Sequence, residues 1–141
     1  MSSIKIGIIG SGNIVTEHLK VLTDNKFFKV YGIVSKTNKN SFSIANKFKI
    51  KKVYKNIDEI FNDNNIDALV VLVSASSTFA VLSKIIPFKK PFFVEKPSGL
   101  NFKESEKLLK LIKKYKNLNM VGYNRRFYSI FEKGLKIISK K

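Results

Sequence analysis

The alternation of strand-like and helix-like segments is the feature that most constrains how this chain can fold. Short apolar runs typical of buried strands are each followed by a stretch whose apolar residues recur at helical spacing. Strands are expected at residues 3–9, 28–34, 51–54, 68–73, 92–94 and 118–121, and helices at 14–22, 41–48, 56–61, 78–86, 101–115 and 132–138. Strands that alternate with helices form parallel sheets. The predicted fold class is therefore α/β, a doubly wound parallel six-stranded sheet with helices on both faces.

The length and composition fit a single domain and exclude several kinds of site. At 141 residues the chain is the size of one domain, and 44% apolar residues is ordinary for a globular protein. It contains no cysteine and one histidine, which excludes disulfide scaffolds, thiolate sites and multi-histidine metal sites, so no metal is expected. No apolar run approaches the roughly 18 residues of a membrane helix, and the N-terminus does not resemble a signal peptide. We expect a soluble cytoplasmic protein that does not bind membranes.

The net charge of +17 requires a separate explanation, because such a charge is common in nucleic-acid-binding proteins. Here 25 of the 27 basic residues are lysines, and they are spread along the chain. Lys, Asn and Ile, which all have A/T-rich codons, make up 55 of the 141 residues. A genome rich in A and T, together with a solvated basic surface, therefore explains the charge. No specific nucleic-acid partner is expected. A basic nucleic-acid-binding protein is kept as an alternative, and in either case the surface attracts anionic ligands.

A glycine turn links the first strand to the first helix. Gly10, Ser11 and Gly12 follow an N-terminal strand and precede a helix, which is the context of a dinucleotide-binding turn. Gly10 permits the tight turn, and Gly12 lets a pyrophosphate approach the backbone. The amides at the start of the helix, at Asn13 and Ile14, would point at the phosphates. An ordinary glycine-rich turn is the alternative, since Gly-x-Gly alone is a weak signal.

Two further residues of the first helix bear on this interpretation. The third small residue usual in such turns would fall at position 15, where the bulk of Val15 is expected to hinder close packing of the helix on the sheet. His18 lies about one turn into the helix, on its inner side. We interpret it as a packed helix histidine rather than as a chemical group.

The end of the second strand favours NADP over NAD. An NAD site usually carries Asp or Glu there to bind the ribose hydroxyls. This chain has Ser35 and Lys36 at that place, Lys39 nearby, and no acidic residue between Asp24 and Asp58. Ser35 can donate to a phosphate, and the lysines can neutralise it. Because the carboxylate is missing, NADP is the predicted cofactor, with NAD as the alternative.

Two more motifs complete a resemblance to a known family. Phe92–Val94 runs straight into Glu95-Lys96-Pro97, and the sixth strand leads into residues 121–127, Val-Gly-Tyr-Asn-Arg-Arg-Phe. With the turn at residues 10–12, these motifs stand in a specific order and spacing. The chain resembles the Gfo/Idh/MocA family of oxidoreductases over essentially its whole length.

The resemblance implies two domains. Residues 1–122 would form an NAD(P)-binding Rossmann domain, and residues 123–141 would be the start of a truncated C-terminal substrate domain. Family members are much longer, and their second domain normally supplies the substrate pocket and an aspartate–histidine pair used in catalysis. The full-length protein is therefore expected to be an active homo-oligomer. The 141-residue chain is expected to bind the dinucleotide, to turn over no sugar substrate, and to self-associate through exposed aromatic residues near Phe127.

The resemblance also implies roles for individual residues. Lys96 corresponds to the lysine that lies beside the nicotinamide and the reacting hydroxyl, and the Lys96–Pro97 peptide is expected to be cis. Glu95 corresponds to a residue near the nicotinamide ribose. Residues 74–77 correspond to the loop that lines the nicotinamide pocket, and residues 124–126 to a segment that borders the same cleft. The family commonly reads Thr-Pro-Asn in that loop, whereas this chain reads Ser-Ala-Ser, with Phe79 near the position of a family histidine.

The predicted function is the cofactor-binding part of an NAD(P)-dependent oxidoreductase. The enzyme would transfer hydride to or from a hydroxyl carbon of a sugar, cyclitol or nucleotide sugar. Removing hydride from an alcohol also requires removing its proton, which a lysine fixed between a strand end and a proline can orient or take, so Lys96 is the predicted catalytic residue. A non-catalytic dinucleotide-binding sensor or scaffold module is the alternative. The predicted cofactor-binding residues are Gly10, Ser11, Gly12, Asn13, Ile14, Ser35, Lys36, Ser74, Ala75, Ser76, Glu95, Lys96, Asn124 and Arg125.

Overall fold

Six parallel strands form one sheet at the centre of the computed structural model, which describes residues 3–139. The strands are β1 (Ile4–Ile9), β2 (Phe28–Val34), β3 (Lys52–Val53), β4 (Ala68–Val71), β5 (Phe92–Val94) and β6 (Asn119–Val121). Their order across the sheet is β3-β2-β1-β4-β5-β6, and every neighbouring pair is parallel. The chain therefore builds the sheet outward from β1 in one direction and then in the other. This confirms the predicted doubly wound α/β fold.

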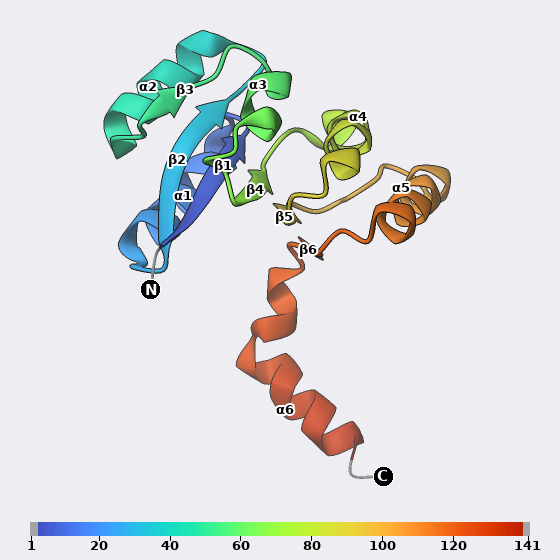
Figure 1. Ribbon diagram of the computed structural model, residues 1–141. Coiled ribbons are helices and arrows are strands. Elements are labelled where there is room, and N and C mark those ends of the chain that lie inside the picture. Colours follow the sequence, from blue (N-terminus) through green and yellow to red (C-terminus); the bar gives the residue numbers. More distant parts are fainter. Residues whose placement is uncertain (1–2, 140–141) are drawn as a thin grey trace.

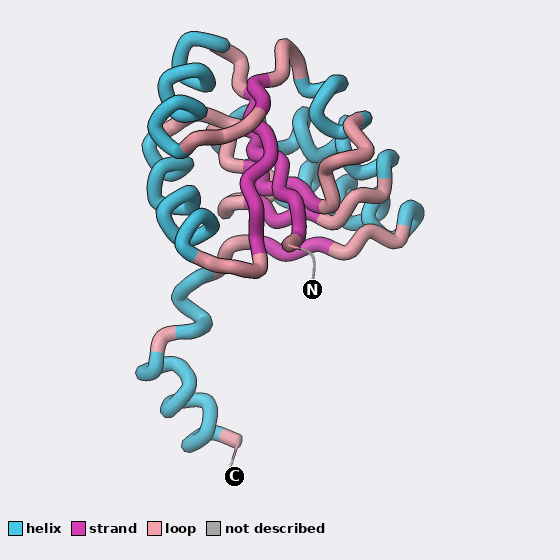
Figure 2. Tube along the Cα trace, turned by 60° about the vertical axis from the view of Figure 1, so that its left-hand side comes forward, coloured by secondary structure: helices cyan, strands magenta, loops and turns pink. Residues whose placement is uncertain are grey.

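Helices cover both faces of this sheet (Figures 1 and 2). The helices are α1 (Asn13–Asp24), α2 (Asn38–Phe48), α3 (Ile57–Asn62), α4 (Ala75–Ile85), α5 (Phe102–Tyr115) and α6 (Ser129–Ile138), with the 3₁₀ turns η1 (Ile86–Phe88) and η2 (Asn124–Phe127). Buried residues of α1 and α2 belong to one apolar cluster, and those of α3, α4 and α5 belong to another. Each face of the sheet thus has its own core.

The alternation of side chains along the central strands separates these two cores. In β4, Leu69 and Val71 belong to the core with α3, α4 and α5, whereas Val70 belongs to the core with α1 and α2. In β1, Ile8 and Ile9 divide between the cores in the same way. All five side chains are buried. Because both faces of these strands are covered, β4 is apolar throughout and β1 is free of charged or polar side chains from Ile6 to Ile9.

The first helix packs closely on the sheet despite its valine. Val15 is completely buried, as is Leu19 one turn further on, and both belong to the core with α1 and α2. The expectation that Val15 would hinder this packing is therefore wrong. The branched side chain fills space between the helix and the strands that a smaller residue would leave empty.

Three helices begin three residues earlier than predicted. Helix α2 begins at Asn38, α4 at Ala75 and α6 at Ser129, rather than at residues 41, 78 and 132. The first turns of α2 and α4 consist of polar or small residues, so these turns give no apolar signal. For α4 the difference matters, because part of the predicted cofactor loop lies in the first helical turn.

Capping boxes stand at the starts of α3 and α5. The Asn56 side chain accepts a hydrogen bond from the Glu59 amide at 3.0 Å, and the Glu59 carboxylate accepts one from the Lys55 amide at 3.0 Å. At α5 the Asn101 side chain accepts from the Glu104 amide at 3.0 Å, and Glu104 accepts in turn from the amide one residue before Asn101. These reciprocal bonds satisfy amides at the helix starts and fix where α3 and α5 begin.

A network around Asp63 joins the end of α3 to β3. Asp63 Oδ2 accepts from Tyr54 Oη at 2.8 Å and from Lys52 Nζ at 2.9 Å, while Oδ1 accepts from the Asn65 amide at 2.8 Å. These bonds, first among them the one from the Asn65 amide, hold the pKa of the Asp63 carboxyl well below its usual range. Burial, together with the bond to Asp63, raises the pKa of the Tyr54 hydroxyl.

Asp63→Asn is expected to lower the free energy of unfolding by about 2 kcal/mol near neutral pH, because the folded chain loses bonds to a charged acceptor. The folded chain binds the Asp63 proton less readily than the unfolded chain. The contribution is therefore fully present above the unfolded pKa of about 4 and is lost as the pH falls below it. Urea unfolding should show that the free energies of unfolding of the wild type and of Asp63→Asn differ at neutral pH and become equal at acid pH.

The control for this variant is Asp58→Asn, which breaks an exposed ion pair with Lys84. Asp58→Asn should lower the free energy of unfolding by no more than about 0.5 kcal/mol. Equal costs for the two substitutions, or a cost for Asp63→Asn that does not depend on pH, would contradict the assigned role of Asp63.

The last helix stands apart from the sheet. Figure 1 shows α6 extending beyond the layered body, and its main contacts are with η2. No residue of α6 is buried, and Phe127, Tyr128 and Phe131 are each more than half exposed. The predicted exposure of aromatic residues near Phe127 is thus confirmed, and the self-association expected from it stays a prediction. Within residues 3–139, none of the helices combines the length and apolar character needed to cross a membrane.

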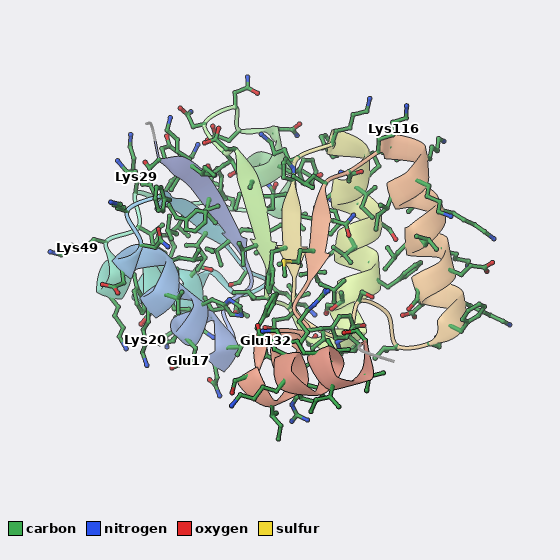
Figure 3. The ribbon with its side chains drawn as sticks, turned by 90° about the horizontal axis from the view of Figure 1, so that it is seen from below. Glu17, Lys20, Lys29, Lys49, Lys116 and Glu132 are labelled. Atoms are coloured by element: carbon green, nitrogen blue, oxygen red, sulfur yellow. The ribbon has the colours of Figure 1, made fainter. Side chains whose placement is uncertain are left out.

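Exposed lysines lie on several elements of the fold. Figure 3 shows Lys29, Lys49 and Lys116 pointing outward from different parts of the molecule. All three are exposed. This distribution fits a solvated basic surface, and the expectation of no specific nucleic-acid partner stays a prediction.

Candidate dinucleotide-binding site

A cavity of about 680 Å³ lies at the carboxyl ends of the central strands. It is next to the point between β1 and β4 where the strand order reverses, which is where sheets of this type bind ligands. Its volume lies in the range of roughly 300–1,000 Å³ that is usual for small-molecule sites. Its lining residues come from the strand ends and the segments after them: Ile9, Gly10, Ser11, Gly12, Ile14, Val34, Ser35, Lys36, Thr37, Lys55, Asn56, Ile57, Leu72, Val73, Ser74, Ser77 and Val81.

The two glycines of the turn are required for different reasons. Gly10 has a φ of +128°, and a Cβ there would collide with the carbonyl oxygen of Leu72. The Gly10 amide also donates to the Val34 carbonyl at 2.8 Å, which ties the end of β1 to β2. Around Gly12, in contrast, a Cβ would meet no heavy atom within 4 Å. Gly10 therefore serves the turn itself, whereas Gly12 keeps the space beside it open.

The start of α1 offers backbone amides to a ligand. Gly12 is the N-cap residue, and no side chain within the described residues caps this helix. The first amide bonded within α1 is that of Val15, which donates to the Gly12 carbonyl at 3.0 Å. Free amides at the positive end of a helix bind phosphate groups. The residues present therefore fit the pyrophosphate of a dinucleotide.

The end of β2 supplies a basic rim. Lys36 lines the cavity, but the Ser35 hydroxyl is already engaged: it donates to the Thr37 carbonyl at 2.8 Å and lies 2.7 Å from Ser41 Oγ. Ser35 thus holds the turn, and its hydrogen is not free for a phosphate. The second cation of the rim is Lys55, which follows β3, whereas Lys39 is outside the lining.

The end of β4 supplies hydroxyl groups. Ser74 is the N-cap residue of α4, and its Oγ lies 3.1 Å from Ser76 Oγ and 3.0 Å from Ser77 Oγ. Ser74 and Ser77 line the cavity, whereas Ala75 and Ser76 do not. Ser77, the last residue of the loop predicted to line the nicotinamide pocket, was not among the predicted cofactor-binding residues, yet it lines the cavity one helical turn after Ser74 because α4 begins early.

A second group of predicted residues gathers at the end of β5. His18 Nε2 lies 2.9 Å from Glu95 Oε1, and the Lys96 amide donates to Glu95 Oε2 at 3.1 Å. The Lys96–Pro97 peptide is cis, as expected, and Lys96 is exposed. His18 is a packed helix histidine, as interpreted, with its ring against Phe93, and it also reaches across to this strand end. No local signal in the sequence indicates this contact.

The cavity gathers some of the predicted site residues and leaves others outside. Those in its lining are Gly10, Ser11, Gly12, Ile14, Ser35, Lys36 and Ser74. Those outside it are Asn13, Ala75, Ser76, Glu95, Lys96, Asn124 and Arg125. Asn124 and Arg125 lie in η2 and are exposed. Within residues 3–139, no group of three or more His, Asp or Glu side chains is placed to hold a metal ion.

Comparison with known proteins decides the family. The model of the Gfo/Idh/MocA family, described as "Oxidoreductase family, NAD-binding Rossmann fold", matches residues 4–123. The chain belongs to this oxidoreductase family. The match confirms the resemblance inferred from the three motifs, and it identifies the α/β domain as the NAD(P)-binding domain of a Gfo/Idh/MocA protein.

Several similar proteins are much longer than this chain. The chain is 31% identical over 132 residues to the myo-inositol 2-dehydrogenase of Thermotoga maritima, covering 92% of this chain and 39% of the relative. A crystal structure of a probable dehydrogenase from Thermotoga maritima has a TM-score of 0.88 at 28% identity, over 97% of this chain and 41% of that chain. The myo-inositol dehydrogenase of Lactobacillus casei, solved with NAD(H) and myo-inositol, shares the fold with a TM-score of 0.92 at 21% identity, over 99% of this chain and 42% of that one. The chain spans about two fifths of the length of these relatives.

Proposed function

We propose that this domain is the cofactor-binding part of an NAD(P)-dependent dehydrogenase that acts on a hydroxyl carbon of a cyclitol, sugar or nucleotide sugar. The observation that carries the proposal is the cavity beside the open Gly12 position and the uncapped start of α1. The names of two relatives, a myo-inositol 2-dehydrogenase and a myo-inositol dehydrogenase solved with NAD(H), support a cyclitol as the substrate.

Four strand ends would share the binding of the dinucleotide. The turn at Gly12 and the first amides of α1 would hold the pyrophosphate. Lys36 and Lys55 would face the adenosine ribose, and Ser74 would lie toward the nicotinamide half. When bound, the dinucleotide supplies the chemistry of hydride transfer.

Lys96 is the proposed catalytic residue. It follows β5, which pairs with β4, so it lies one strand beyond Ser74 along the carboxyl edge of the sheet. Its ammonium group would orient the substrate hydroxyl, and its amine form would take the proton that leaves as the alcohol is oxidised. Glu95 would lie near the nicotinamide ribose.

We also propose that the nucleotide-binding domain covers residues 1–122 and that residues 123–141 begin a second domain. The family match ends at residue 123, and α6 has no buried residue and contacts mainly η2. Asn124 and Arg125 would then border the cleft between the two domains. A cytoplasmic homo-oligomer is the expected state of the full-length protein.

The direct test is calorimetric titration of the 141-residue chain with NADP⁺ and with NAD⁺. We expect saturable binding of at least one of them at one site per chain. Failure of both to bind a chain that circular dichroism shows to be folded would contradict the proposed function.

NADP⁺ should bind more tightly than NAD⁺, because Lys36 and Lys55 line the cavity and no acidic residue does. Lys36→Glu should weaken NADP⁺ binding by about 10–100-fold, the cost of one charge-assisted phosphate contact of about 1.5–3 kcal/mol, and should change NAD⁺ binding much less. Lys55→Glu should act in the same direction.

The matched control for these variants is Lys39→Glu. It makes the same change in charge on the same segment, but Lys39 is exposed and outside the lining of the cavity. It should leave the ratio of the two affinities nearly unchanged. Equal binding of NADP⁺ and NAD⁺ by the wild type would defeat the proposed preference.

A further inference from the structure

The side chain of His18 joins two segments that are far apart in the sequence. Its Nε2 lies 2.9 Å from Glu95 Oε1, across a separation of 77 residues. The imidazole also packs against the ring of Phe93, with 5.5 Å between the ring centroids. The His18 and Glu95 side chains are only 24% and 22% exposed. This contact connects α1, which starts at the phosphate-binding turn, to the strand end that carries Lys96.

The chemistry of the pair fixes which group donates. An ionised carboxylate only accepts hydrogen bonds, so the hydrogen must be on His18 Nε2, whether the ring is neutral or cationic. The other carboxylate oxygen, Oε2, accepts from the Lys96 amide at 3.1 Å. One carboxylate is therefore bonded to α1 through one oxygen and to the backbone of the proposed catalytic lysine through the other.

The surroundings restrict where this carboxylate can go. The Glu95 amide donates to the Val71 carbonyl at 3.1 Å, which holds its backbone against β4. On the side of β6, a Cβ on Gly122 would lie 3.3 Å from Glu95 Oε1 and 2.8 Å from Phe93 Cζ. A side chain at this position would therefore require the Phe93 ring to shift. The carboxylate thus lies between α1 and the end of β6, while the Glu95 backbone is bonded to β4.

We infer that His18 is a positioning residue that couples the phosphate-binding start of α1 to Lys96 through Glu95. A ligand that binds the first amides of α1 and shifts or stiffens that helix moves His18 with it. The bond to Glu95 transmits the change to the backbone amide of Lys96. The inference rests on the proposed function, because His18 and Glu95 would position Lys96 for the proposed dehydrogenase reaction.

The first experiment tests the hydrogen bond between His18 and Glu95 by NMR on the 141-residue chain. His18 is the only histidine, so its ring nitrogens can be identified without ambiguity. We expect Nε2 to carry the hydrogen, and Glu95→Gln to shift the ring signals. A ring that carries its hydrogen only on Nδ1, with signals unchanged in Glu95→Gln, would overturn the inference.

The second experiment tests the coupling with adenosine 2′-phosphate 5′-diphosphate. This probe contains the adenosine and pyrophosphate of NADP but neither the nicotinamide nor its ribose. In the wild type, the probe should shift the amide signals of Ile14 and of Lys96. In His18→Leu the Ile14 shift should persist and the Lys96 shift should be lost. His18→Gln, which keeps an N–H donor of similar reach, should restore it.

The matched control is Glu17→Ala, in the same helix. Glu17 and Lys20 form an exposed ion pair 2.8 Å long, and both project outward from α1 (Figure 3). The Lys96 response should be the same in this variant as in the wild type. A Lys96 response that persists unchanged in His18→Leu would overturn the coupling. Absence of any Ile14 shift in the wild type would instead contradict both the proposed function and the coupling. The ring signals of His18 would still decide whether the hydrogen bond to Glu95 exists.

Discussion

Gly12→Val is expected to abolish dinucleotide binding and leave the chain folded. The backbone at Gly12 is extended, with φ −77° and ψ 177°, a conformation that valine adopts readily, and a Cβ there meets no heavy atom within 4 Å. The same open space is where the pyrophosphate would approach the amides of α1. The added isopropyl group should raise the dissociation constant by at least about 100-fold, or about 2.7 kcal/mol. Calorimetry measures the binding. The free energy of unfolding, measured with urea, should change by less than about 0.5 kcal/mol.

Gly10→Ala is the contrasting variant two residues away. Its φ of +128° is unfavourable for any residue with a Cβ, and that Cβ would collide with the Leu72 carbonyl oxygen. We therefore expect it to destabilise the fold by about 3 kcal/mol or more. A folded Gly12→Val chain that binds the dinucleotide normally would remove the basis for placing the pyrophosphate at this turn.

The 141-residue chain is expected to bind the dinucleotide and to oxidise no myo-inositol at a measurable rate. Hydride transfer needs the alcohol carbon held in near-attack geometry, and such positioning contributes roughly 7–11 kcal/mol. Lys96 is exposed and outside the lining of the cavity. A substrate beside it would therefore be surrounded mostly by solvent and would not be held in place. Losing that contribution lowers the rate by at least about 10⁵-fold.

The measurement is the appearance of reduced cofactor in the presence of myo-inositol. The myo-inositol 2-dehydrogenase of Thermotoga maritima serves as the positive control. A Lys96→Met chain, purified in the same way, controls for a contaminating dehydrogenase. Steady reduction of the cofactor by the wild-type chain that Lys96→Met removes would show that this chain holds its substrate by itself.

Several features of the fold could be predicted because their signals are local. The apolar runs of β1 and β4 indicated buried strands, and the starts of α3 and α5, where capping boxes join residues only three apart, were predicted to within one residue. The starts of α2 and α4 were predicted too late, because a polar first turn gives no apolar periodicity. The effect of Val15 on the packing of α1 was also predicted wrongly, because the space available to a side chain depends on neighbours that are distant in the sequence.

The sequence by itself determined the glycine turn, since a strand, Gly10, Gly12 and a helix follow one another directly along the chain. Only the tertiary structure decided that Lys55 joins Lys36 at one cavity, because that depends on β3 lying next to β2. It alone also decided that His18 meets Glu95, 77 residues away. Turns and caps depend on backbone geometry within a few residues, whereas contacts between strand ends depend on strand order and on side-chain direction. Those two properties are fixed only when the whole sheet has formed.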